Sequence, residues 1–421
     1  MLELARYPDF VRLFVGRVVT NAGDSVYYIA SMWLVYDLTG STFYTGLAAF
    51  LAMLPTTLQF LFGPLVDRTP LRPLLVTTQL AQAGLVAAIP LAAWTGYLSV
   101  WLVLAVMPAL SLLNQPVYPA QSAALPRIVD REDLVAANSA FSLSYQGVDA
   151  AFNALAGLLV ALVGTTVLFL LDSLSFLVAA LAFATLRVRP PTRDPSPGGA
   201  DDAVDGRVAV DGGKSSYLSE LRVGVDFVRG SVIARILVGA VVTNLAFGAA
   251  MAVLPAYGDS LGGATAYGLL TASVGGGLLV GALLASALRR FPFGRLVVVG
   301  LSISAVLWVA AVALRWLPGT VALLLLSFVP VGATNVLLLS MTQVLVPEGL
   351  LGRVTAVITS VAAGATPFGA LLGGAAADAL SASAVMAATG VSFALLAAYW
   401  LLSPRLRRLP RVDAVETVAL D

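Results

Sequence analysis

The chain of 421 residues contains no cysteine and no histidine. Disulfides, thiol nucleophiles and metal sites built from these two residue types are therefore excluded. Proton transfer near neutral pH has to use carboxyl groups, because histidine is the side chain that ordinarily titrates in that range. The formal net charge is only +1, so the composition also indicates no basic surface for nucleic acid.

Charged residues are scarce as well, at 11% of the chain, whereas hydrophobic residues make up 59%. A soluble domain is about one quarter charged, and a soluble surface with so few charges would expose large apolar patches. The composition therefore predicts that a lipid bilayer surrounds most of the chain; the alternative is a large soluble protein with a very apolar core. The opening stretch MLELARYPDFVRLF is mixed and charged, and we expect it not to be a cleaved signal peptide.

Long apolar runs recur along the whole chain. A helix needs ~20 such residues to cross ~30 Å of hydrocarbon, and the runs lack the alternation of a membrane β-barrel. We therefore predict an all-α polytopic membrane protein with twelve transmembrane helices. The predicted spans are 11–37, 43–65, 74–94, 98–120, 137–162, 165–186, 232–256, 265–288, 296–314, 319–345, 354–377 and 384–402.

The basic residues predict the orientation. If the N-terminus is cytoplasmic, all but two of the 24 arginine and lysine residues fall in cytoplasmic segments; the exceptions are Arg17, within the first span, and Arg315, in an outer loop. This asymmetry is typical of proteins inserted with the basic loops inside. We expect a multi-pass protein of the cytoplasmic membrane with both termini in the cytoplasm.

A hydrophilic stretch divides the spans into two groups of six. We predict a six-helix bundle over 1–186, a cytoplasmic linker over 187–230, a second six-helix bundle over 231–403 and a cytoplasmic tail over 404–421. The first part of the linker is rich in Pro, Gly and Asp and should be flexible. Its last part predicts an amphipathic helix on the inner membrane surface, with apolar residues at Leu218, Leu221, Val225 and Val228.

The two groups of spans are similar to each other. The stretch VVTN occurs at 18–21 and again at 241–244, and three further pairs of segments match in order at nearly the same spacing, with Arg72 on Arg295 and Gln121 on Gln343. Ordered matches favour an internal duplication over a coincidence among apolar helices. Parallel repeats related about the membrane normal are a transporter architecture, with the substrate site between the halves near the midplane.

The loop GPLVDRTPLRP (63–73) resembles the signature G-x-x-x-D-R-x-x-R-R of the major facilitator superfamily. Gly63, Asp67, Arg68 and Arg72 match, and one of the two closing arginines is missing. The stretches RLFVGRVVTNAGDSVYYIASMWLVYDLTGS, PAQSAALPRIVDREDLVAANSAFSLS and FLLDSLSFLVAAL are similar to the drug:proton antiporter branch that contains macrolide and enterobactin exporters. The resemblance covers residues 5–405.

This resemblance implies alternating access driven by the proton gradient, with no other cofactor and no metal. It also implies that Asp67 caps a helix of the opposite half and holds the inner side shut, since carboxylates stabilise helix N-termini by ~0.3–1 kcal/mol. The alternative is that this loop carries charge only to set topology. Two segments depart from the branch: the fourth span lacks a membrane arginine, and the fifth reads QGVDAAFNALAGLL instead of G-P-x-x-G-G. The eleventh span keeps a closer version, GATPFGALLGG (364–374).

Asp24 is the leading candidate for proton coupling. It lies ~21 Å into the first span by helical rise, where an ionised carboxylate costs at least ~3 kcal/mol unless it faces a cavity or a partner. Arg17 is almost two turns earlier on the same face, and Asn21 lies between them. The alternatives are that Arg17 extends to the inner interface and that Asp24 only hydrogen-bonds a neighbour.

Asp149 is the second candidate acid, and it shares a helix face with Gln146 and Asn153. We expect Asp172, in the sixth span, to make a structural bond to a serine or to the backbone. Further candidates could line the cavity or equally bond between helices, and a tryptophan could instead anchor at the membrane interface: Trp33, Gln115, Asn244, Asn335 and Gln343.

The sequence thus predicts a proton-coupled exporter of a hydrophobic or amphipathic small molecule. An importer or uniporter on the same fold is one alternative, and a non-transporting receptor or lipid-handling scaffold is another. We expect no enzyme, because no catalytic constellation of Asp, Ser or Tyr stands out, and no ATP-driven transport, because no Walker loop is found. The expected partners are a small-molecule substrate, protons and membrane lipid, with no nucleic acid, and the protein is expected to be a monomer.

Overall fold

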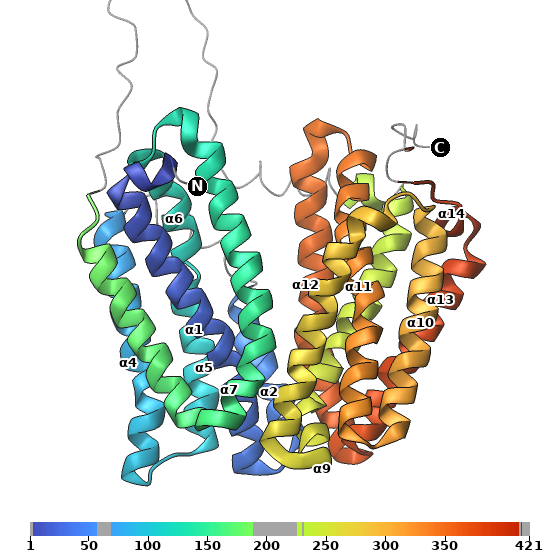
Figure 1. Cartoon of the computed structure of the whole chain (residues 1–421), viewed down its shortest axis with the longest axis horizontal. Coiled ribbons are helices and arrows are strands. Elements are labelled where there is room, and N and C mark those ends of the chain that lie inside the picture. The colour runs from blue at the N-terminus through green and yellow to red at the C-terminus, as the bar shows by residue number, and fades with distance from the viewer. Residues whose placement is uncertain (1–2, 57–68, 188–224, 230, 412–413, 415–421) are drawn as a thin grey trace, which may run out of the picture.

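In the computed structural model, the described residues are 3–56, 69–187, 225–229, 231–411 and 414. Their helices form two bundles that stand side by side (Figure 1). Helices α1 to α7 make the first bundle and α9 to α13 make the second. The start of α1 and the end of α13 lie at the same end of the molecule, and this end is called the terminal end below.

The first bundle begins with η1 (Glu3–Arg6) and the long α1 (Pro8–Thr39). A proline suits the first turn of a helix, and α1 stops at Gly40, whose φ of 62° is in the left-handed region that favours glycine. The next elements are α2 (Thr42–Met53), α4 (Leu71–Thr95), α5 (Val100–Asn114), α6 (Val117–Ile128), η3 (Arg131–Asp133) and α7 (Leu134–Ala184). Helix α7 turns at Gly164, where φ is 78°, and so supplies two spans.

The second bundle repeats this plan. Helix α9 (Val232–Leu288) turns at Gly262 and Gly263, both with positive φ, and also supplies two spans. It is followed by α10 (Phe293–Leu314), α11 (Leu317–Leu345), α12 (Glu348–Ala379), α13 (Ala382–Leu402) and the short α14 (Pro404–Arg407).

The prediction of an all-α membrane protein is confirmed. Eight helices of the described residues are long and apolar enough to cross a membrane. Each of the twelve predicted spans coincides with a helical segment, with α5 and α6 together forming the fourth; the second span is described only as far as Thr56. Most of the predicted linker, 188–224 and 230, lies outside the described residues, while 225–229 is helical and Val228 packs against α9 and α12. The domain boundaries stay a prediction.

The start of the chain is fixed to the loop before α7. The carboxylate of Asp133 accepts hydrogen bonds from Tyr7 (2.8 Å) and Arg6 (2.5 Å). These two bonds hold the pKa of Asp133 below its usual range, the Tyr7 bond having the larger effect. The carboxyl group of Asp133 therefore stays ionised throughout the neutral pH range, and so does its ion pair with Arg6.

The hydrophobic core shows where the bundles meet. One continuous cluster contains residues of both bundles, among them Met32 and Ala49 of the first and Tyr257 and Ala370 of the second. Toward the terminal end, the core separates into a cluster within the first bundle around Phe183 and clusters within the second. The bundles are thus packed together at the end opposite the termini and have separate cores at the terminal end (Figure 1).

Candidate functional site

Arg17 lies inside the first bundle with only 5% of its surface exposed. Its Nε donates to the hydroxyl of Tyr145 (2.9 Å) and to Oε1 of Gln121 (3.2 Å), and its Nη1 donates to Thr20 (3.3 Å). Tyr145 in turn donates to the same Gln121 oxygen. The guanidinium also lies over the Tyr145 ring, 5.5 Å from its centroid. Arg17 is therefore held by neutral groups within the bundle rather than extending to the membrane surface.

No carboxylate among the described side chains lies within 4.0 Å of Arg17. Its partners come from α1, α6 and α7, so the cluster ties three helices together around a buried cation. The repeat-related positions of the second bundle lack this arrangement, because Ala240 stands at the position of Arg17. Gln343, the counterpart of Gln121, is exposed. The Arg17–Gln121–Tyr145 cluster is thus specific to the first half.

Asp24 is half-buried, seven residues beyond Arg17 on α1. The side-chain amide of Asn114, at the end of α5, donates to its Oδ2 at 3.4 Å. Asp172 of α7 lies against the backbone of Gly23, where a Cβ would overlap its carboxylate. The carboxyl groups of Asp24 and Asp172 are therefore close enough to interact electrostatically.

Asp172 itself is 1% exposed and accepts a hydrogen bond from Ser175 (3.3 Å), in agreement with the expected bond to a serine. Its neighbour Ser173 donates to the carbonyl of Ala83 and joins α7 to α4. Five buried polar groups of this bundle have no hydrogen-bond partner in the described part of the chain: Tyr27, Ser31, Gln79, Gln82 and Oδ2 of Asp172. Such groups are ordinarily bonded to ordered water, so the core of this bundle suits ordered water molecules.

The end opposite the termini is closed by a carboxylate from the other bundle. Helix α2 begins after Ser41, whose own side chain makes no capping bond. Asp378, at the end of α12, accepts from the N–H of Thr42 (2.9 Å), from the hydroxyl of Thr42 (2.7 Å) and from the hydroxyl of Ser41 (2.7 Å). Asp378 thus serves as the N-cap of a helix in the opposite bundle, a geometry that carboxylates favour.

Small residues bring the bundles close beside this cap. A Cβ at Gly46 of α2 would lie 2.5 Å from the carbonyl oxygen of Ala370 and 3.1 Å from the Cα of Gly374. Thr45 donates to the carbonyl of Ala252 at 2.6 Å. The glycine-rich segment 364–374, noted in the sequence, therefore forms part of the closed contact.

Trp33, a predicted cavity residue, also lies at this closed end. Its ring stacks on Tyr267 of α9, with centroids 5.4 Å apart, and the Tyr267 hydroxyl donates to the carbonyl of Ile29. Trp33 therefore packs between the two bundles.

A cavity of about 330 Å³ lies within the second bundle toward the terminal end. Two predicted residues, Asn244 and Asn335, line it together with Thr243, Thr334 and the ring of Trp400. Asn244 accepts a hydrogen bond from Thr366 (3.1 Å) and donates to the carbonyl of Ala240. The lining contains no charged residue, so the polar groups available to a ligand there are neutral.

The other predicted residues lie elsewhere. Gln115 is buried and donates to the carbonyl of Ser111 within its own helix region. Asn21 donates to the carbonyl of Tyr145 at 3.5 Å. Arg72 is exposed in the first turn of α4. The remaining gating residues lie outside the described residues, as do three side chains of α7, and their roles stay predictions: Gly63, Asp67, Arg68, Gln146, Asp149 and Asn153.

The Arg17 cluster gives a stability prediction. We expect Gln121→Leu to lower the midpoint of thermal unfolding of the purified protein by on the order of 5 °C. Removing the acceptor leaves a buried charged donor with fewer partners, which costs ~1–3 kcal/mol. Gln343→Leu, at the exposed repeat-related position, should have almost no effect.

A second variant separates this cause from a simple packing defect. Adding Arg17→Met to Gln121→Leu removes the charge as well as its acceptor, and should recover most of the lost stability. If the double variant is instead less stable than Gln121→Leu alone, the cluster is not held by the hydrogen bonds to Arg17.

The chain is similar in sequence to transport proteins. The family model described as transmembrane secretion effector matches residues 5–421. The multidrug efflux pump Tap of Mycobacterium tuberculosis is 28% identical over 425 residues, which cover 97% of each chain. An uncharacterised MFS-type transporter of Bacillus subtilis, YvqJ, is 29% identical over 139 residues, a third of each chain.

Among solved structures, a bacterial homologue of the human lysosomal transporter Spinster, in an inward-facing and unoccupied conformation, is similar in fold. The TM-score is 0.68 at 13% sequence identity, and the match covers 94% of this chain and 96% of the other.

Proposed function

The chain belongs to the transmembrane secretion effector family of the major facilitator superfamily, and from this premise we propose that it exports a hydrophobic or amphipathic small molecule in exchange for protons. It is an integral multi-pass membrane protein of a transporter family, and the proposal assigns it no chemical reaction on its substrate. The likeness to the multidrug efflux pump Tap over 97% of both chains supports export as the direction.

One observation carries the proposal: the bundles share a core at one end and have separate cores at the other. Two bundles that meet at one end only are what alternating access between two repeats requires. Described arginines between spans, among them Arg127, Arg289 and Arg290, lie at the terminal end, while Arg315 lies at the opposite end. This asymmetry supports a cytoplasmic membrane location with both termini inside. In that orientation, the structure corresponds to the state open to the cytoplasm.

The chemistry of the two bundles differs in a way that suits an amphipathic substrate and a proton. The cavity of the second bundle offers amide and hydroxyl groups and the Trp400 ring without any charge. The first bundle contributes the charged groups, with Arg17 in its cluster and Asp24 beside Asp172. We assign substrate contact chiefly to the neutral cavity, and proton exchange to Asp24 with Asp149 as the second candidate. The proton gradient is the only energy source that the proposal needs.

The test uses purified protein in liposomes with an imposed pH gradient. A panel of fluorescent hydrophobic cations and neutral dyes is followed, and dye movement is compared with that in protein-free liposomes. Movement that requires the gradient and reverses when the gradient is reversed supports proton-coupled antiport. Movement that ignores the gradient supports a uniporter instead, and co-movement of dye and protons supports an importer.

A panel in which no dye moves, while the protein remains folded, would contradict the exporter proposal. A receptor or lipid-handling scaffold on the same fold would then explain the chain better. The expected monomer is checked in the same preparation by the mass of the protein–detergent complex.

A further inference from the structure

A pocket of about 690 Å³ lies at the terminal end of the second bundle, where α10 begins and α13 ends. The segment after α13 folds back to form one wall. The N–H of Phe293 donates to the carbonyl of Pro410 (3.0 Å), and the N–H of Gly294 donates to that of Leu409 (3.3 Å). Gly294 is needed there, because a Cβ on it would overlap the backbone of the returning segment. The pocket is therefore a defined part of the fold.

Three arginines line this pocket: Arg295 in the first turn of α10, Arg407 at the end of α14, and Arg408 just after it. All three are exposed. Within the described part of the chain, none of the three guanidinium groups forms an ion pair within 4.0 Å. Three like charges around one pocket repel one another, and an anion bound between them would relieve that repulsion. Guanidinium groups bind phosphate with paired hydrogen bonds.

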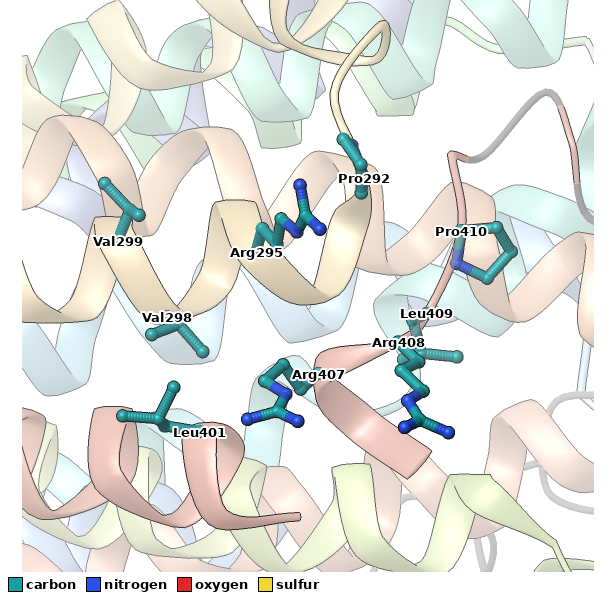
Figure 2. A pocket seen from close by; sticks show the side chains of 9 residues that line it. All are labelled: Pro292, Arg295, Val298, Val299, Leu401, Arg407, Arg408, Leu409 and Pro410. Carbon is teal, nitrogen blue, oxygen red and sulfur yellow. The ribbon is translucent and has the colours of Figure 1, made fainter. Parts of the chain in front are cut away.

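Three aliphatic residues of the lining lie together on one side. Val298 and Val299 follow Arg295 by about one turn of α10, and Leu401 is in the last turn of α13. Figure 2 shows these three side chains at one end of the pocket and the arginines toward the other end. Val299 is 57% exposed and Leu401 is 47% exposed. Because α10 runs away from the terminal end, the aliphatic side chains lie deeper in the bilayer than the arginines.

We propose that this pocket binds an anionic phospholipid of the cytoplasmic leaflet. The phosphate lies among Arg295, Arg407 and Arg408, and the first part of an acyl chain lies on Val298, Val299 and Leu401. Basic pockets on the cytoplasmic side of membrane helices attract anionic lipid head groups. A free phosphate would contact the arginines but not the aliphatic residues. A phospholipid contacts both, because its acyl chain lies deeper in the bilayer than its phosphate, as the aliphatic residues lie deeper than the arginines. The inference rests on the proposed orientation and not on the transported substrate.

The test is lipid binding by native mass spectrometry of the full chain, delipidated in detergent and titrated with phosphatidylglycerol. We expect wild type to bind one phosphatidylglycerol at least tenfold more tightly than phosphatidylcholine, and 10 mM inorganic phosphate not to displace it. A triple variant of the pocket should bind phosphatidylglycerol at least tenfold more weakly than wild type. This variant carries Arg295→Gln, Arg407→Gln and Arg408→Gln.

A matched triple variant removes the same charge from the same end of the bundle outside the pocket. It carries Arg289→Gln, Arg290→Gln and Arg405→Gln, three exposed arginines that do not line the pocket. It should bind phosphatidylglycerol as wild type does. Equal weakening in both triple variants would overturn the proposal, because the arginines would then act only through net charge.

Three further outcomes, two in wild type and one in a shortened chain, also overturn it, whether or not the triple variants fold. Equal binding of phosphatidylcholine removes the role of the anionic head group. Displacement by inorganic phosphate makes the pocket a site for a free anion. The third outcome is that phosphatidylglycerol binds only after residues 412–421 are deleted. This segment contains Asp413, Glu416 and Asp421, so the result would show that the chain's own acidic tail occupies the pocket.

Discussion

Asp24→Asn is expected to reduce gradient-driven dye movement in liposomes to the level of protein-free vesicles, while dye binding stays within about threefold of wild type, a change below 1 kcal/mol. The amide has the size of the carboxyl group and can still accept the hydrogen bond from Asn114. It cannot take up or release a proton, so the step that we propose to couple the two conformations to the gradient is lost. A ligand or proton shifts such an equilibrium only if it binds the two states differently.

Asp37→Asn is the matched control for this experiment. Asp37 is an exposed acid near the other end of the same helix, so its replacement makes the same chemical change without touching the bundle core. We expect it to transport as wild type does. If Asp24→Asn also transports at the wild-type rate, Asp24 has a structural role, and Asp149 becomes the acid to test.

Gly46→Val is expected to hold the outer side open and to lower transport at least about tenfold. Its Cβ would meet the carbonyl oxygen of Ala370 and the Cα of Gly374, both backbone atoms of the other bundle that no rotamer change can move. Overpacking of this kind costs ~1–3 kcal/mol. The substitution therefore destabilises only the state in which the bundles touch at Gly46, since they are apart there when the outer side is open.

The absence of cysteine makes this opening measurable. Ala49 lies one turn after Gly46 on the same buried face of α2 and is 1% exposed. In an Ala49→Cys background, a membrane-impermeant maleimide added outside should label the Gly46→Val protein much faster than its parent. Gly84→Val is the control, because nothing lies within 4 Å of a Cβ at that position. Unchanged labelling together with normal transport would show that the Gly46 contact does not close the outer side.

The arrangement of the spans could be predicted from the sequence because it depends on the lengths of the apolar runs and on their order along the chain. The length of each apolar run reports whether it crosses the bilayer, and the matching segments around VVTN predicted two similar halves. The turns at Gly164 and at Gly262–Gly263 fall where the sequence predicts a short break between spans. The Gly-rich stretch 364–374 was also visible, although not its partner across the bundles.

The site could be predicted only in part. Arg17 and Asp24 stood out because charge is rare in apolar runs, but their neighbours depend on how α1, α6 and α7 rotate against one another, which spacing along a single helix does not report. Asp172 was expected to bond a serine and does so, yet its approach to Asp24 depends on the absence of a side chain at Gly23. The sequence analysis did not predict the role of Asp378. One feature of the sequence could have indicated a cap from another helix: the second span begins with Ser-Thr and has no acid of its own in its first turn.

The bond between Asp378 and α2 also bears on leakage through the carrier. Helix α2 is capped only while the bundles touch, so every excursion to the outward-open state exposes its first N–H groups to water. A lost cap is worth ~1 kcal/mol, which is about a fivefold change in population. In the proposed orientation, the cap therefore favours the state whose binding site faces the cytoplasm, where cargo for an exporter is found. Compounds outside the cell meet an open site less often, which limits their return through the same route.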